Sequence, residues 1–261
     1  MSDIRDLLYP DDPHQPKDAY VAARSAMKKP LPKRFYATVS VVAAKDGFEI
    51  HLDGKRVRTP GGAGLLLPSE AAATLVAAEW AAQDEVIDPA SMHATRIANV
   101  GIDRVGAVRD EVIAGIIKYA ASDLVCYRAG APEGLVALEN AVWQPVLDHM
   151  RTRHGARFVL AQGIGFAEQP KASLDAVEVA VRQVTSPIAL AALDTLVTLS
   201  GSVLIFVALI DGVLDAEAAF AAASVEEDWN TRLWGEDAEA LHRRTRRHQE
   251  FMAAANLLAA L

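Results

Sequence analysis

The stretch KRFYATVSVVAAKDGFEIHLDGKRVRTP (residues 33–60) decides the first part of the fold. Its first run alternates, with Phe35, Ala37, Val39 and Val41 on one face and Tyr36, Thr38 and Ser40 on the other. A second alternating run, FEIHL (48–52), follows, and Asp-Gly pairs stand at 46–47 and 53–54. Asp-Gly between alternating runs is typical of tight β-hairpins. The stretch therefore predicts a small antiparallel meander that ends near residue 68.

After Pro68 the hydrophobic period changes from that of a strand to that of a helix. Ser69 is a candidate N-cap for the helix EAAATLVAAEWAAQ. Further helical patterns are predicted near 105–119, 135–154, 172–184, 187–211, 215–233 and 236–260, with a strand-like interruption at 156–166. Strands do not alternate with helices, so a doubly wound sheet is not expected. We predict an α+β fold with a proline-rich arm (1–32), a small β-rich domain (33–68) and a larger all-α helical domain (69–261).

Composition narrows the function classes. The chain has 261 residues, 51% of them hydrophobic, and 34 acids against 26 bases give a net charge of −8. This balance argues against general nucleic-acid binding. The single cysteine excludes a disulfide framework within the chain. The acidic N-terminus resembles neither a secretory signal nor a mitochondrial transit peptide, so we expect a bacterial cytoplasmic protein.

One apolar segment needs comparison with a membrane span. Sixteen uncharged residues run from Thr195 to Ile210 between two aspartates. That is shorter than the roughly 20 residues required to cross a bilayer. The sequence predicts a buried core helix, broken at Ser-Gly-Ser (200–202), and no membrane insertion.

Other chemical motifs are weak. PGGAG (60–64) lacks the Lys-Ser/Thr of a phosphate loop and is typical of a hairpin corner. The histidine pairs 149/154 and 242/248 lack the i, i+4 spacing of ligands on one helix face, so we expect no metal site. Cys126 lies on an apolar stretch and is expected to be a buried hydrophobe. The basic run HRRTRRHQE (242–250) is interpreted as a solvated helix face.

The stretch SVEEDWNTRLWGED (224–237) is the most distinctive functional candidate. Its acids, Glu226, Glu227, Asp228, Glu236 and Asp237, could perform acid–base chemistry if they were held in a cleft. Alternatively, tryptophans surrounded by acids suit a protein partner that presents Arg or Lys. A third interpretation places both tryptophans in the core and leaves the acids facing water. The residues alone do not decide between the last two interpretations.

Several fragments together resemble one family. They are KRFY (33–36), LDGKRVRTP (52–60), LPSEAAATLVAAEWAAQ (67–83), YAASDLVCYRA (119–129) and SVEEDWNTRLWG (224–235). In order and spacing they resemble the F-type ATP synthase assembly chaperones that bind the alpha subunit, the ATP synthase assembly factor 2 family. The resemblance runs from about Lys33 to about Glu239. It implies a small β domain joined to a helical domain, with no catalysis and no cofactor.

The resemblance also implies a partner and a site. The implied partner is the unassembled alpha subunit, which the chaperone protects from aggregation until the beta subunit replaces it. Within the family an acidic position in the matching segment is tied to function. The acidic candidates carried over are Glu226, Glu227, Glu236 and Asp237, and with Trp229, Trp234 and Gly235 of the same stretch they make up the predicted partner-binding residues. Glu79, Trp80 and Gln83 also match the family, but Trp80 is expected in the core and Glu79 as a structural hydrogen-bonding group. The alternatives are a small carboxylate-dependent hydrolase or transferase, and a scaffold without a client.

Overall fold

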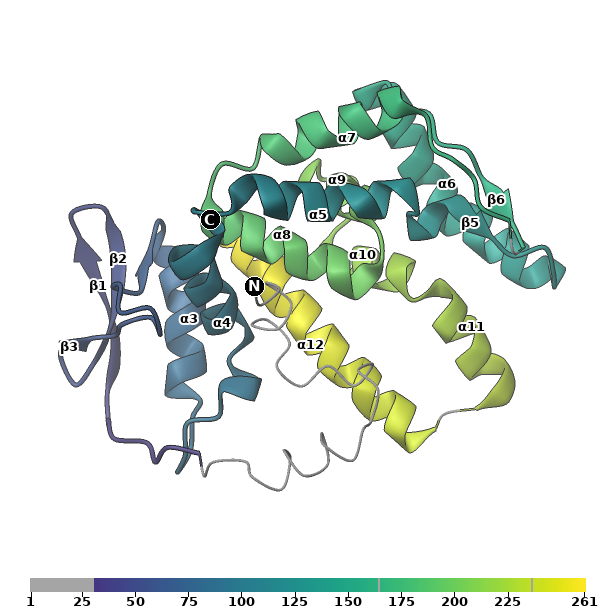
Figure 1. The fold of residues 1–261 in the computed structure, drawn as a ribbon. Coiled ribbons are helices and arrows are strands. Elements are labelled where there is room, and N and C mark those ends of the chain that lie inside the picture. Colours follow the sequence, from purple (N-terminus) through teal and green to yellow (C-terminus); the bar gives the residue numbers. More distant parts are fainter. Residues whose placement is uncertain (1–30, 164, 236) are drawn as a thin grey trace, which may run out of the picture. The chain divides into compact units, whose positions relative to one another are not determined.

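The computed structural model describes residues 31–163, 165–235 and 237–261 (Figure 1). The first thirty residues of the predicted proline-rich arm lie outside this range. The described chain forms two compact groups. We call residues 31–103 the strand unit and residues 104–260 the helical unit, and each is described by itself.

Four short antiparallel strands open the strand unit. They are β1 (Val39–Ala44), β2 (Gly47–Leu52), β3 (Lys55–Arg56) and β4 (Leu66–Leu67). The middle strand, β2, pairs with each of the other three, in register from Val39 opposite Leu52 to Ala44 opposite Gly47 along β1. The predicted antiparallel meander, and with it the α+β fold class, is confirmed.

One of the two predicted turns lies at its Asp-Gly pair, and the other lies one residue earlier. Asp53 and Gly54 form the second turn with φ of +48° and +76°, the left-handed region that a two-residue hairpin turn of this kind requires. In the first turn Gly47 already belongs to β2 and pairs with Ala44. The turn residues there are those at 45 and 46, one position earlier than the Asp-Gly pair suggested.

The first strand begins later than its alternating pattern suggested. The Asp53 carboxylate accepts hydrogen bonds from the backbone N–H of Ala37 and Thr38 and from the Thr38 hydroxyl, at 2.8–3.2 Å. Tyr36 is buried and donates its hydroxyl to the Trp80 carbonyl at 2.7 Å, whereas Phe35 is exposed. Because a side chain occupies these backbone donors, residues 35–38 do not join the sheet ladder.

Helix α3 (Glu70–Ala81) begins at the predicted cap, where Ser69 Oγ accepts from the Ala72 N–H at 3.0 Å. It packs on β1 and β2, and α4 (His93–Val100) packs beside it after a 3₁₀ turn (Pro89–Ser91). A short π-helical segment (Gly101–Val105) follows. The predicted domain boundary at residue 68 falls inside this compact group. The compact group continues to residue 103 because the sheet is too small to cover its own apolar face without α3.

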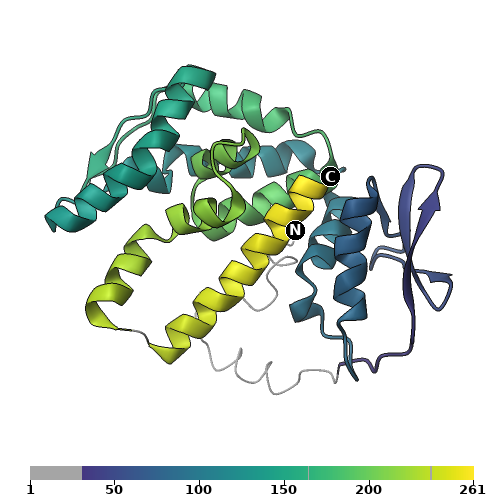
Figure 2. The ribbon, with the colours of Figure 1, turned by 180° about the vertical axis from the view of Figure 1, so that it is seen from behind.

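The helical unit contains eight described α-helices (Figures 1 and 2). They are α5 (Arg109–Ala121), α6 (Glu133–His154), α7 (Lys171–Arg182), α8 (Pro187–Ser200), α9 (Val203–Ile210), α10 (Ala216–Ala223), α11 (Val225–Trp234) and α12 (Ala238–Ala260). Helix α6 continues through Pro145 and ends at Gly155, with φ of +67°. The strand-like segment contributes β6 (Ala161–Gln162), which pairs in parallel with β5 (Tyr127–Arg128).

The core of the helical unit is built around α9. This helix contacts α5, α6, α7, α8 and α10, and its residues 203–208 are all buried. Helix α12 lies along α8 (Figure 2). The predicted break between α8 and α9 is confirmed, with Gly201 at φ of +71°. Within the described ranges, none of the helices combines the length and hydropathy of a membrane span.

A buried carboxylate fixes the break between α8 and α9. Asp123, which is fully buried, accepts hydrogen bonds from the Ser202 hydroxyl (2.6 Å) and from the N–H groups of Val203 (2.8 Å) and Leu204 (3.1 Å). These N–H groups belong to the first turn of α9, where intrahelical acceptors are missing. Burial raises the pKa of Asp123 to about 6, against the lowering effect of its hydrogen bonds.

Candidate functional site

The stretch 224–237 forms α11, the turn after it and the cap of α12. The two tryptophans of α11 have different environments. Trp229 is half-buried against α6, where a Cβ added to Gly134 would come within 2.5 Å of Trp229 Cη2. Trp234, at the end of the helix, is 84% exposed. Trp229 is therefore a packing residue of α11, whereas Trp234 presents its ring to solvent.

Trp234 is one of three exposed apolar residues near the junction of α11 and α12. Leu233 and Leu241 are also exposed, at 56% and 46%. Gly235 ends α11 with φ of +85°, a conformation that L-residues with a side chain rarely adopt. An open, shallow groove at this junction is lined by Glu226, Glu227, Asn230, Thr231, Trp234, Gly235, Asp237 and Ala240. We call Leu233, Trp234, Leu241 and this groove the α11–α12 surface.

Two of the acids on α11 are held by arginines of α12. Arg247 donates to Glu227, and Arg244 Nη1 lies 2.5 Å from Asp228 Oδ1 and 3.6 Å from Glu227 Oε2. These side chains are 27–35% exposed. The basic run was interpreted as a solvated helix face. The structure instead turns Arg244 and Arg247 toward α11, so part of the run joins two helices.

The remaining acids of the stretch differ from one another. Asp237 Oδ2 accepts from the Ala240 N–H at 2.8 Å and so caps α12. Glu226 is exposed and lines the groove. Burial raises the pKa of the neighbouring Glu139, and the charge and hydrogen bonding of Glu226 raise it further. Glu236 lies outside the described residues.

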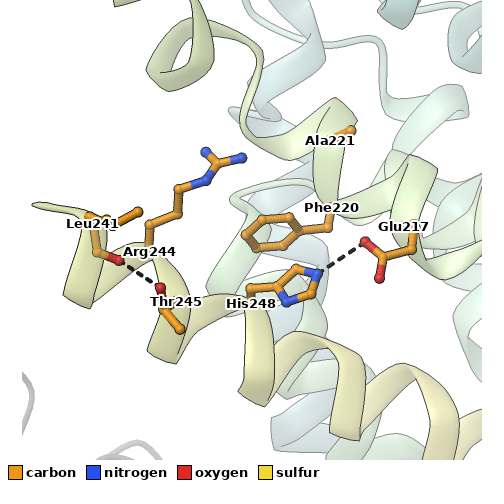
Figure 3. A pocket seen from close by; sticks show the side chains of 7 residues that line it. All are labelled: Glu217, Phe220, Ala221, Leu241, Arg244, Thr245 and His248. Atoms are coloured by element: carbon orange, nitrogen blue, oxygen red, sulfur yellow. Dashed lines mark hydrogen bonds and ion pairs between the residues drawn. The ribbon is translucent and has the colours of Figure 1, made fainter. Parts of the chain in front are cut away.

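A second hollow lies between α10 and α12 (Figure 3). The Phe220 ring stands between Arg244 and His248, with ring centroids 4.8 Å apart for Phe220 and His248 and the Arg244 guanidinium carbon 5.4 Å from the Phe220 centroid. His248 Nε2 lies 3.0 Å from Glu217 Oε2. Arg244 therefore contacts both the Phe220 ring of α10 and the acids Glu227 and Asp228 of α11. Through these contacts one side chain of α12 links α10 and α11.

The other residues singled out in the sequence have structural environments. Glu79 accepts three hydrogen bonds at 2.7 Å, from the Ala94 N–H and from the N–H and hydroxyl of Thr95, and so holds the first turn of α4. Gln83 donates to the Glu79 carbonyl at 3.0 Å. Burial raises the Glu79 pKa. The carboxylate of Glu79 is thus engaged in holding a helix end.

The glycine-rich corner and the cysteine are also accounted for by packing. The Gly61 N–H donates to Asp103 Oδ2 at 2.7 Å, so a carboxylate occupies a donor that a phosphate loop would offer its ligand. Cys126 is fully buried, and burial raises its pKa to about 12. The Cys126 thiol is therefore protonated at neutral pH, which does not suit a nucleophile.

His149 and His154 of α6 lie close together although their spacing of five residues places them on different faces of the helix. The side chains of His149 and His154 converge on Asp211 at the end of α9. The sequence spacing gave no sign of this, because the third residue comes from a distant part of the chain.

Comparison with known proteins places these features in a family context. Residues 33–151 match the family model described as ATP12 chaperone protein. The crystal structure of the Atu1473 protein from Agrobacterium tumefaciens is 42% identical, with a TM-score of 0.84, over 98% of this chain and 96% of that chain. Atp12 from Paracoccus denitrificans is 35% identical, with a TM-score of 0.79, over 88% of this chain and 98% of that chain. An Asp-to-Lys mutant of the Paracoccus protein matches with the same identity and TM-score.

Proposed function

Because this chain belongs to the ATP12 chaperone family, we propose that it binds the unassembled alpha subunit of F-type ATP synthase. In this proposal it covers the alpha-subunit surface that later receives the beta subunit, prevents aggregation, and is then replaced by the beta subunit. The protein would act in the bacterial cytoplasm, where the subunits are made. It performs no chemical step and needs no cofactor for this role.

The exposure of Trp234 is the observation that supports the α11–α12 surface as the client-binding site. A tryptophan that is 84% exposed leaves apolar surface in water that a partner can cover, and Leu233 and Leu241 near the same junction are exposed as well. Exposed apolar clusters rimmed by polar residues are typical of protein-binding surfaces. The adjoining groove supplies the polar rim through Glu226 and Asp237.

The candidate residues divide into two roles. Trp234 and Glu226 are the side chains we assign to client contact, because both are exposed on the α11–α12 surface, although Glu226 also contacts the buried Glu139 of α6. Trp229, Glu227 and Asp237 act indirectly by holding α11 and α12 in place through the contacts described above. Gly235 sets the direction of the turn.

A contact of this kind suits a transient complex. The exposed apolar area is small, and its surroundings are charged, so binding is expected to be moderate in strength. A chaperone must release its client to the correct neighbour, and affinity differences between related complexes are expressed mostly in the dissociation rate. A modest, partly polar interface therefore favours exchange for the beta subunit.

The geometry does not favour the carboxylate-dependent enzyme. Acid–base chemistry needs a carboxyl group with access to substrate in a sheltered site. Glu227 and Asp228 are engaged by Arg244 and Arg247, and the groove beside them is shallow and open. These contacts suit a structural support for a binding surface better than a proton-transfer pair.

The proposal is tested by refolding the alpha subunit with and without the purified chain. Light scattering should fall as the wild-type chain is added, and the Glu226→Lys variant should protect less. Glu168→Lys is the matched control, because Glu168 is also an exposed glutamate in the helical unit. Unchanged scattering with the wild-type chain would contradict the proposed function. Equal loss of protection in both variants would contradict the assignment of the α11–α12 surface.

A further inference from the structure

Two histidines and an aspartate converge at one end of the helical unit. His149 and His154 come from the last two turns of α6, and Asp211 follows the last residue of α9. The Nε2 atoms of His149 and His154 lie 2.7 Å and 2.6 Å from the same oxygen, Asp211 Oδ2. We propose that these three side chains form a binding site for a divalent transition-metal ion of the zinc type.

The distances fit such an ion after a small adjustment. Zinc binds imidazole nitrogen and carboxylate oxygen at about 2.0–2.2 Å, which places neighbouring ligands in a tetrahedral site about 3.3 Å apart. The three ligand atoms here lie within 4.8 Å of one another. Opening each nitrogen–oxygen distance by roughly 0.6 Å would make room for the ion, a change within reach of small side-chain rotations.

The donor set selects a class of metal. Two imidazoles and one carboxylate are ligands that zinc and neighbouring transition metals accept. Magnesium and calcium prefer oxygen ligands in larger numbers, so they are expected to bind poorly. Three protein ligands leave further coordination positions, and the Asp211 side chain is 23% exposed, so water can complete the shell.

The helix geometry explains how the pair comes together. Five residues correspond to about 140° around a helix, so His149 and His154 do not share one face. His154 is the last residue of α6, and the chain leaves the helix at Gly155 in the left-handed conformation. Asp211 approaches from α9, which packs against α6, so each ring reaches it from a different direction. The two ring planes accordingly lie at 77° to each other.

The triad differs from the ordinary histidine–carboxylate pairs of this chain. His51 pairs with Glu49 and His248 with Glu217, each at 3.0 Å and each as a pair. Within the described residues, the triad is the cluster in which three such groups present ligand atoms close enough to hold one ion. One imidazole donating to Asp211 Oδ2 would already join α6 to the end of α9. The second imidazole on the same oxygen is more than that contact requires.

The test uses the full chain, first treated with a chelator and then titrated with zinc chloride in a calorimeter. We expect saturable binding of about one zinc ion per chain. Cobalt(II) chloride should compete with zinc and give a visible spectrum of low-symmetry coordination, whereas millimolar magnesium should not compete.

Variants separate a metal site from a structural clamp. His149→Gln and His154→Gln each keep an N–H that can donate to Asp211 but remove an imidazole ligand. Each should weaken zinc binding by more than about 10-fold, because changes to groups that only support a ligand already cost 10–100-fold. His248→Gln is the matched control and should bind zinc like the wild type.

The outcomes are decisive in either direction. Zinc should raise the melting temperature of the wild type and of His248→Gln, and should leave the His149→Gln and His154→Gln variants unchanged. Absence of saturable binding to the wild type would overturn the proposal, as would equal affinity in the triad variants. Because zinc binding is measured on the chain alone, the result is independent of whether the chain binds the alpha subunit.

Discussion

Replacement of Trp234 by alanine separates client binding from folding. The side chain is 84% exposed, so its removal takes little from the packed structure. Surface substitutions of this kind change the free energy of unfolding by about 0.5 kcal/mol or less. The same exposed area is what a client would cover. We therefore expect Trp234→Ala to melt like the wild type and to protect the alpha subunit poorly.

The size of the effect follows from the exposed area. A tryptophan offers up to about 250 Å², and covering 84% of it at about 25 cal/mol per Å² would contribute about 5 kcal/mol. This is an upper limit, because a client covers the ring incompletely and the ring loses rotational freedom on binding. A loss of about 1.4–2.8 kcal/mol is expected, which corresponds to a dissociation constant about 10–100-fold higher.

The assay measures the chaperone concentration that halves light scattering during alpha-subunit refolding. For Trp234→Ala this midpoint should rise by the same 10–100-fold factor. Phe166→Ala is the matched control, since Phe166 is an aromatic residue of the helical unit with 73% exposure. An unchanged midpoint for Trp234→Ala would refute the reasoning, and so would an equal shift for Phe166→Ala, which would point to a general loss of apolar surface.

Three further predictions concern the supports of the site and the core. Gly134→Ala should lower the free energy of unfolding by about 1–3 kcal/mol in denaturant titration, because the added methyl group meets the Trp229 ring and this outweighs the better helix propensity of alanine. Asp123 has a folded pKa of about 6, above its ordinary value of 3.8, so its contribution to stability is fully present below about pH 4 and is lost as pH rises through 6. The difference in free energy of unfolding between the wild type and Asp123→Asn should therefore change between pH 4 and pH 6. A difference that stays constant across this window would contradict the assignment. Glu227→Lys should cost at most about 1 kcal/mol through repulsion from the arginines of α12, and adding Arg247→Glu should recover part of that loss in a double-mutant cycle.

Sequence signals located the features that depend on neighbours along the chain. The left-handed pair Asp53-Gly54 and the cap at Ser69 need only a few consecutive residues, and both are found where they were predicted. The late start of β1 could not be predicted in this way, because the Asp53 side chain reaches back across the hairpin to residues 37 and 38. The contact of Asp53 with Ala37 and Thr38 therefore keeps residues 35–38 out of the strand, although their alternating pattern is typical of one.

The candidate site shows the same division more sharply. In the sequence the acids of 224–237 are equivalent, and nothing local distinguishes Glu226 from Glu227. The distinction comes from α12, whose Arg247 engages Glu227, and from the turn, where Asp237 caps a helix. The convergence of His149 and His154 on Asp211 was missed for a related reason. A rule based on spacing within one helix cannot find a cluster whose third member, Asp211, lies 57 residues beyond His154.

The way α11 is attached bears on how a chaperone can bind a client and still release it. Val225 is the one buried residue among the ten of α11, whereas residues 203–208 of α9 are all buried. The other attachments of α11 are the Trp229 ring on α6, the contact of Glu226 with the buried Glu139 of α6, and ion pairs that are about one-third exposed. Exposed ion pairs contribute little stability and weaken in salt, so small shifts of α11 cost little free energy. A surface presented by such a helix can adjust to a client without disturbing the core around α9, and the same low cost limits how firmly the client is held.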